Sequence, residues 1–133
     1  APSNQGNYAW GCSGTDIPNT STAVGTGANN TTYILAGCYQ RSIAASACAD
    51  LVWNGYSDWY LPSIDELYIM FSHRFDINRR LSQVNGSQLI GLSYYWSSTE
   101  LDKTNALSFN TINGMIAQDA KSTMKKVRAI RKY

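Results

Sequence analysis

The chain has 133 residues and a formal net charge of +2, and only 15% of its residues are charged. An average soluble domain carries roughly 25% charged residues, so most of the polar surface here has to be neutral. The length suits one domain with one core, and no apolar run approaches the roughly 20 residues that a membrane-spanning helix needs. This composition, rich in Tyr and Trp, is more typical of an extracellular β-rich module than of a cytosolic enzyme.

The N-terminal third is predicted to consist mainly of loops. Residues 1–7 are interpreted as the end of a linker, and residues 8–133 as a single ligand-binding domain. The sequence does not start with a signal peptide, so we expect it to represent the mature part or a fragment of a secreted protein. Gly, Asn, Thr and Ser dominate residues 1–32, which predicts loops with a short strand near residues 8–10.

Two short segments before residue 40 are ambiguous. Gly25-Thr26-Gly27 lacks the Gly-Lys-Ser/Thr ending of a phosphate-binding loop, and we expect no helix directly behind it. A tight turn is therefore predicted there. Residues 32–36 fit either a short strand or the start of a helical turn.

Three cysteines, Cys12, Cys38 and Cys48, leave one thiol unpaired if a disulfide forms. They contain no Cys-x-x-Cys spacing, and His73 is the only histidine, so a zinc site is not expected. One disulfide and one free thiol is typical of an extracellular domain. We favour Cys38–Cys48, then Cys12–Cys38, and three buried free thiols remain the alternative.

Two helices are predicted in the first half of the chain. The first spans residues 42–54, where apolar residues recur at helical spacing and Gly55 ends the pattern. The second follows Ser63, which can act as N-cap and form a capping box with Glu66. It is expected to end near His73.

Strands dominate the second half, which predicts an α+β fold. Asn113-Gly114 is a strong hairpin signal between two strand-like segments. Asn85-Gly86 is a further turn signal, Arg79 and Arg80 are expected on an exposed loop, and residues 119–124 are predicted to form a polar loop. The predicted strands are residues 94–99, 106–111, 115–118 and 127–131.

Four segments, found in family order, resemble the bacterial extracellular domain family DUF1566. They are Asp58–Leu67, which reads DWYLPSIDEL, Tyr94–Glu100, which reads YYWSSTE, Val127–Arg131, which reads VRAIR, and Val24–Gly27, which reads VGTG. This family is related to the C-terminal domain of the Legionella collagen-like adhesin. The resemblance implies a C-type-lectin-like fold, with two helices from the N-terminal half packed on an antiparallel sheet from the C-terminal half. The calcium-site motifs of C-type lectins are absent, so calcium-dependent sugar binding is not expected.

The sequence does not predict an enzyme. His73 is expected at a helix end, and the serine and threonine hydroxyls of residues 97–99 have no histidine partner. Asp58 and Glu100 are expected to bond backbone amides or an arginine such as Arg128, with a carboxylate pair as the alternative. The fold is related to that of formylglycine-generating enzymes, but their catalytic cysteines have no evident counterpart. We therefore expect no catalytic residues, no cofactor and no metal.

Positive charge is concentrated at the C-terminal end. Residues 1–102 carry four basic and eight acidic residues, whereas residues 103–133 carry seven basic and one acidic residue. This asymmetry predicts a polyanion-binding end, with chance segregation as the alternative. Residues 124–129 also fit the x-basic-basic-x-basic-x pattern of heparin-binding segments. The candidate ligand-binding residues are Lys121, Lys125, Lys126, Arg128, Lys132, Lys103, Arg79 and Arg80.

Lys121, Lys125 and Lys126 are the principal candidates, because the resemblance implies structural roles for Arg128 and Arg131. The predicted function is a secreted or cell-surface adhesin domain that binds sulfated glycosaminoglycans such as heparin, for host attachment and biofilm formation. The stalk of the collagen-like adhesin implies a homotrimer, and nucleic acid is expected to bind only non-specifically. One alternative is a structural head that trimerises a fibre, and another is a neutral-sugar lectin that uses Trp and Tyr faces.

Overall fold

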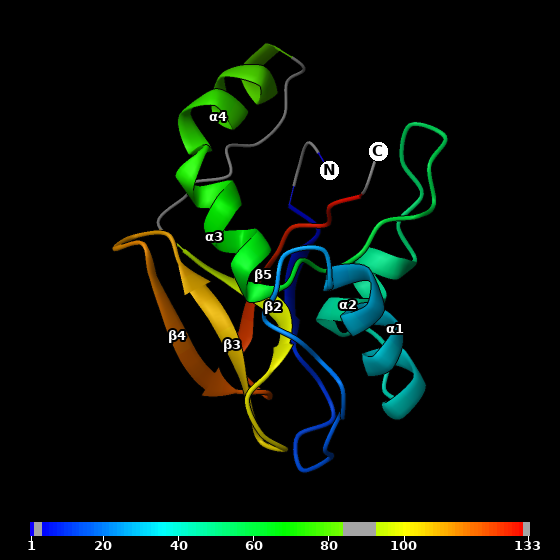
Figure 1. The fold of residues 1–133 in the computed structure, drawn as a ribbon. Helices are drawn as coiled ribbons and strands as arrows, with labels where there is room; N and C mark the ends of the chain where they lie inside the picture. Colours follow the sequence, from blue (N-terminus) through cyan, green and yellow to red (C-terminus); the bar gives the residue numbers. More distant parts are fainter. Residues whose placement is uncertain (2–3, 84–92, 132–133) are drawn as a thin grey trace.

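Four helices and five strands make up the described part of the chain, which is an α+β fold (Figure 1). The structure, a computed structural model, describes residue 1, residues 4–83 and residues 93–131, so Lys132 and the Asn85-Gly86 turn signal lie outside the described residues. The elements are β1 (Gly6–Ala9), α1 (Gly27–Gly37), α2 (Ala44–Ala49), α3 (Ile64–Ser72), α4 (Arg74–Gln83), β2 (Tyr94–Glu100), β3 (Asn105–Asn110), β4 (Met115–Ala120) and β5 (Met124–Val127).

The strands form one mixed sheet in the order β1-β5-β2-β3-β4. The β2-β3-β4 meander is antiparallel, as predicted. Strand β5 then crosses back to lie between β1 and β2, antiparallel to β1 and parallel to β2. The sheet is therefore not purely antiparallel, because its last strand pairs with two strands that are distant in the sequence.

Helix α3 begins with the predicted capping box. The Ser63 hydroxyl accepts a hydrogen bond from the Glu66 N–H at 3.3 Å, and the Glu66 carboxylate accepts one from the Ser63 N–H at 2.8 Å. His73 forms the C-cap, as expected. Ile64 and Leu67 on the apolar face of α3 are buried together with two rings of the sheet, Tyr95 and Phe109.

The other helices differ from the predictions. Helix α1 begins directly behind the Gly25-Thr26 turn, where no helix was expected, and it contains residues 32–36. Helix α2 is only six residues long, because Asp50 ends it and the chain then enters a hairpin. Arg79 and Arg80 lie on helix α4 rather than on a loop, although both are exposed as predicted.

The last strand is also shifted. Strand β5 ends at Val127, where the predicted strand begins. Of residues 128–131, the described residues beyond it, only Ile130 forms a bridge, to Tyr60. Strand β1 begins at Gly6, and the Gln5 N–H donates to the Val127 carbonyl at 2.8 Å. Part of the segment interpreted as a linker end is thus paired with β5.

Cys12 and Cys38 form the disulfide, with their Cα atoms 5.9 Å apart. The favoured pairing, Cys38–Cys48, is wrong, and the second choice is correct. Cys48 is a free thiol on α2, where it faces the main core with Ala44 and Ala45. Burial raises the pKa of the Cys48 thiol far above its ordinary value.

The main core lies between the sheet and the two short helices α1 and α2. Its largest side chains are Trp10 and Trp96, which are 1% and 0% exposed. Each indole N–H donates to a backbone carbonyl, of Ser97 and Tyr8 respectively, at 2.8 Å. The core is therefore closed around two tryptophans whose polar atoms are satisfied.

The start of α1 depends on a glycine that leaves room for Glu66. The Gly27 N–H donates to Glu66 Oε1 at 3.0 Å, and a Cβ at Gly27 would lie 2.3 Å from that oxygen and 2.9 Å from the Leu61 carbonyl. We expect Gly27→Ala to lower the free energy of unfolding by about 1–3 kcal/mol, as overpacking does, measured by urea denaturation. Gly37→Ala is the matched control, because its Cβ would meet only the tip of Ile17. Equal losses in the two variants would contradict this reading.

Candidate functional site

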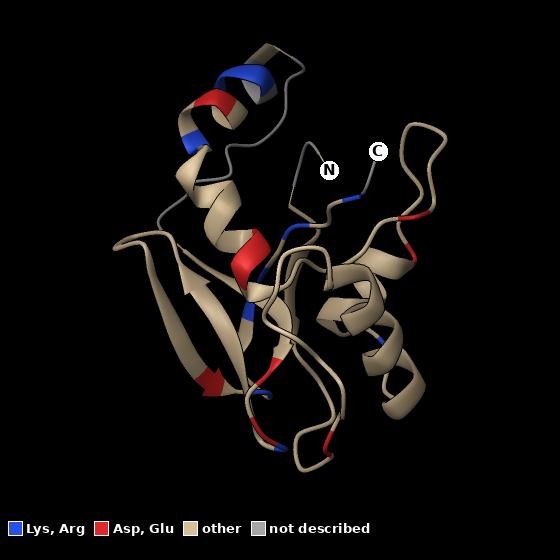
Figure 2. Cartoon of the chain, in the orientation of Figure 1, with Lys and Arg blue, Asp and Glu red and all other residues tan. Residues whose placement is uncertain are grey.

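The structure does not gather the predicted basic residues into one patch. Lys121, Arg128 and Lys125 are buried, at 0%, 2% and 7% exposed, and Lys126 is half-buried. Figure 2 shows basic residues of α4 at one end of the molecule and the turn between β2 and β3, which contains Lys103, at the other. The uniform polyanion-binding end that the sequence suggests is therefore not a single surface among the described residues.

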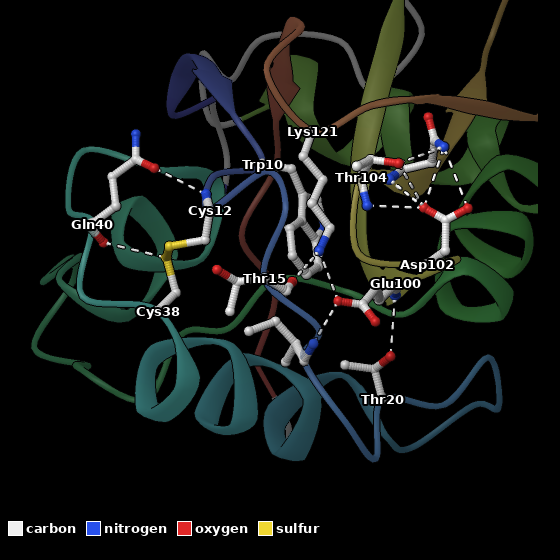
Figure 3. A network of polar contacts seen from close by, with 12 residues as sticks. Trp10, Cys12, Thr15, Thr20, Cys38, Gln40, Glu100, Asp102, Thr104 and Lys121 are labelled. Atoms are coloured by element: carbon white, nitrogen blue, oxygen red, sulfur yellow. Dashed lines mark hydrogen bonds and ion pairs between the residues drawn. A yellow bond between two sulfur atoms is a disulfide. The ribbon is translucent and has the colours of Figure 1, made fainter.

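Lys121 is part of a buried polar network (Figure 3). Its Nζ donates to Glu100 Oε2 at 2.7 Å and to the Thr15 carbonyl at 2.9 Å, and it lies 4.6 Å from the centroid of the Trp10 ring. Glu100 Oε2 also accepts a hydrogen bond from the Ile17 N–H at 2.7 Å. Burial raises the pKa of Glu100, while the hydrogen bonds from Lys121 and Ile17 oppose that change. Lys121 is thus unavailable to a ligand in this structure.

Two arginines of the C-terminal segment also have internal partners. Arg128 donates to the Asn4 side chain at 2.8 Å and to the Ala1 carbonyl at 2.9 Å. Arg131 donates to both carboxylate oxygens of Asp58, at 2.7 and 3.0 Å. Asp58 therefore has an arginine partner, as expected, but it is Arg131 rather than Arg128. These contacts agree with the structural roles that the resemblance implies.

Two of the principal candidates, Lys125 and Lys126, line an open depression of about 590 Å³. The depression lies across strands β1, β2, β4 and β5 and the turns that adjoin them. Its lining residues are Asn7, Ser93, Tyr94, Ala117, Asp119, Thr123, Met124, Lys125 and Lys126. This is the place where the structure brings predicted ligand-binding residues together.

Lys125 is held in a fixed position within the depression. Its Nζ lies 2.9 Å from Asp119 Oδ2, 4.2 Å from the centroid of the Tyr94 ring and 5.3 Å from that of Trp96. Asp119 additionally accepts a hydrogen bond from the Ser108 hydroxyl at 3.3 Å. These contacts on several sides fix the conformation of the Lys125 side chain, so its ammonium group has a set position in the lining of the depression.

Tyr94 is the exposed ring of the depression, and Lys126 lies at its border. Tyr94 is 39% exposed, and it projects from the face of β2 opposite Tyr95, which packs under α3. Lys126 is half-buried and has no ion pair in the described part of the chain. The depression thus combines an aromatic ring, the ammonium group of Lys125 with its Asp119 partner, and neutral hydrogen-bonding side chains. Lys126 borders it, but as the partner of Tyr95 it starts from the opposite face of the sheet.

Such a combination can bind a sugar that carries an acidic group. A tyrosine ring packs against the apolar face of a pyranose, and a lysine pairs with a sulfate or carboxylate. Sequence reasoning missed Asn7, Tyr94 and Asp119, because the depression forms only when four strands pair.

Removing Lys121 should leave a buried carboxylate without its partner. We expect Lys121→Met to lower the free energy of unfolding by about 3–5 kcal/mol, measured by urea denaturation. Adding Glu100→Gln should recover part of the loss, because the amide oxygen can still accept from the Ile17 N–H. The exposed Lys103→Met is the matched control, and a loss in Lys121→Met no larger than in this control would contradict the structural role.

The comparisons with known proteins agree with the motifs in the sequence. Residues 4–131 match the family model described as the Lcl C-terminal domain, which is the DUF1566-type family that the motifs indicate. A search of curated proteins found no significant match. Within the described residues, no helix has the length and apolar character needed to cross a membrane. Because the family match covers almost all of the chain, the protein belongs to the Lcl C-terminal domain family.

Proposed function

We propose that this domain is the ligand-binding part of a secreted or cell-surface adhesin and that it binds sulfated glycosaminoglycans such as heparin in the sheet depression. Family membership fits an adhesin-like domain of a collagen-like protein. The observation that carries the proposal is the open depression of about 590 Å³ that places the Tyr94 ring beside Lys125, with Lys126 at its border. In the organism, this activity would support host attachment and biofilm formation.

The geometry favours a small number of charged contacts for each domain. Asp119 compensates Lys125, so further positive charge would have to come from Lys126, which borders the depression and has no ion pair in the described part of the chain. An exposed ion pair contributes only about 0.2–1 kcal/mol, so charge alone cannot give tight binding. Stacking on Tyr94 and hydrogen bonds to Asn7 and Thr123 would have to contribute the rest.

Because each single site binds weakly, tight attachment requires several copies of the domain to bind together. Several copies that bind one polymer raise the overall affinity without new contacts, provided that the sites can engage it simultaneously. We therefore propose that the domain acts as a homotrimer. Nucleic acid would bind the same lysines only as a non-specific polyanion.

The proposal is for a binding domain rather than an enzyme. The hydroxyl groups of the YYWSSTE motif have structural partners: Ser97 Oγ donates to the Leu107 carbonyl at 2.6 Å, and Thr99 Oγ1 donates to the Ser21 carbonyl at 2.9 Å. Ser98 Oγ accepts from the Asn30 amide at 3.2 Å. These contacts hold β2 to its neighbours and orient none of the hydroxyls toward the depression.

A second candidate function is an assembly head that joins copies of the chain. It is favoured by three exposed apolar residues at the tip of the β3–β4 hairpin, where Ile112, Met115 and Ile116 are 57%, 64% and 49% exposed. Strand β4 is the outer strand of the described sheet, and an apolar edge strand can pair with another chain. Light scattering of wild type and Ile116→Lys would test this alternative.

Binding to immobilised heparin across a salt series tests the proposed function. We expect a slope of log affinity against log salt of roughly −1 to −2 for the monomeric domain, because few free cations face the ligand. Lys126→Ala should flatten the slope by about one, and Tyr94→Ala should weaken binding with the slope retained. Lys103→Ala, which removes an exposed lysine outside the depression, should leave retention unchanged.

Two results would count against heparin-like ligands. Wild-type retention no stronger than on a plain sulfonate cation exchanger would mean that charge alone is responsible. Equal weakening by Lys103→Ala and Lys126→Ala would mean that the ligand is not held in the depression. Either result would favour the assembly-head alternative.

A further inference from the structure

A second feature of the molecule is a short hairpin between α2 and α3 that displays two aromatic side chains. The backbones of Trp53 and Tyr56 exchange two hydrogen bonds, both of 3.0 Å. Asn54 and Gly55 between them have φ values of 52° and 80°, as a type I′ turn requires. In Figure 1 this loop projects beside the C-terminal end of the chain, on the other side of the molecule from β4.

Both rings are braced from one side. The Trp53 ring meets the ring of Trp59 edge-on, with centroids 6.2 Å apart, and Trp59 Nε1 donates to the Tyr56 carbonyl at 3.1 Å. The guanidinium carbon of Arg131 lies 3.6 Å from the centroid of the Tyr56 ring. The two rings therefore have fixed orientations before any ligand arrives.

The charges around the rings are balanced. Arg131 pairs with Asp58 through two hydrogen bonds, and these hold the pKa of the Asp58 carboxyl below its usual value. Asp58 therefore stays ionised at neutral pH, and the pair has no net charge. The ion pair beside the Tyr56 ring thus contributes no net charge.

Trp53 is the one tryptophan of the chain that is not buried. Trp53 and Tyr56 are each 45% exposed, whereas Trp10, Trp59 and Trp96 are at most 8% exposed. A fixed aromatic ring in water gives up the stabilisation that burial would provide. The folded domain itself gives no reason for this exposure, because Trp59 and Arg131 already hold the hairpin in place.

We propose that Trp53 and Tyr56 form a platform that binds the apolar face of a pyranose ring in an uncharged glycan. The C–H face of a sugar matches the size and apolar character of such rings, and its hydroxyl groups lie at the edge, where Asn54 and the guanidinium of Arg131 can donate hydrogen bonds. Because Arg131 beside the Tyr56 ring is already paired with Asp58, the site favours a sugar without acidic groups. This site is separate from the depression and does not depend on the proposed glycosaminoglycan binding.

A sugar suits this surface better than a folded protein does. Stable protein interfaces bury about 800 Å² on each partner. Two half-exposed rings offer roughly 200 Å² together, and exposed polar side chains, Asn54, Ser57 and Asp58, lie beside them. One or two sugar units would cover an area of this size.

Tryptophan fluorescence provides a direct measurement, because Trp53 is the only tryptophan of the chain that is more than 8% exposed. The probes are maltohexaose, cellohexaose, mannohexaose and chitohexaose. We expect at least one of them to shift the emission to shorter wavelength and to protect Trp53 from acrylamide quenching, in a saturable manner. High salt should not weaken this response, since no ion pair forms with the ligand.

Variants locate the site. Trp53→Ala removes the fluorescent reporter, so binding by Trp53→Ala and Tyr56→Ala is followed calorimetrically, and each should weaken binding roughly tenfold or more. Phe75→Ala is the matched control, because Phe75 is an aromatic residue of α4 that is 74% exposed. Gly55→Ala should also weaken binding, since it strains the turn at φ 80° while leaving both rings intact. Thermal unfolding confirms that each variant is folded.

Testing each variant against both ligands distinguishes failure of the hairpin platform from failure of the proposed heparin binding. Trp53→Ala should retain its binding to heparin, and Lys126→Ala should retain its binding to the neutral oligosaccharide. The platform is overturned if none of the four probes changes the Trp53 signal, if both ring variants bind as wild type does, or if Phe75→Ala weakens binding equally.

Discussion

The ion pair between Lys121 and Glu100 is the contact on which the arrangement of the sheet depends. It joins the end of β2 to the turn between β4 and β5, and through Thr15 and Ile17 it fixes the N-terminal loop. A buried pair of this kind adds little net stability over apolar packing, but removing one partner is expensive, so it specifies one arrangement of the three segments. Lys125 and Lys126 follow four and five residues after Lys121, on the strand that leaves this turn, so the anchoring of Lys121 helps to set their position.

Glu66 has the equivalent role on the other side of the fold. Its carboxylate accepts from Ser63 at the start of α3 and from Gly27 at the start of α1, so one side chain joins two helix N-termini where negative charge is favourable. Several of the few charged residues of this chain are thus used for internal connections. This explains why a basic C-terminal sequence does not become a basic surface: a cation that holds segments together is withdrawn from the solvent.

The sequence predictions are correct where the interacting residues lie close together in the chain and wrong where they lie far apart. The capping box of α3 lies within four residues and was predicted correctly, as was the hairpin around Asn113-Gly114. The start of α1 was missed because the partner of Gly27 is 39 residues away. The position of β5 was wrong because its register is set by pairing with β1, at the other end of the chain. The burial of Lys121 could not be predicted either, since its carbonyl acceptor, Thr15, is 106 residues distant.

The same reasoning explains where binding surfaces can arise. The depression needs four strands in register, so its residues are scattered along the sequence and a motif search finds only the lysines of β5. The hairpin platform is local: Trp53 and Tyr56 flank a two-residue turn, and only the bracing by Arg131 comes from far along the chain. Arg131 belongs to the closing motif and Asp58 to the DWYLPS motif, so two segments that identify the family also fix the platform. A motif that holds the fold together can thus position exposed rings beside it without being part of the binding surface itself.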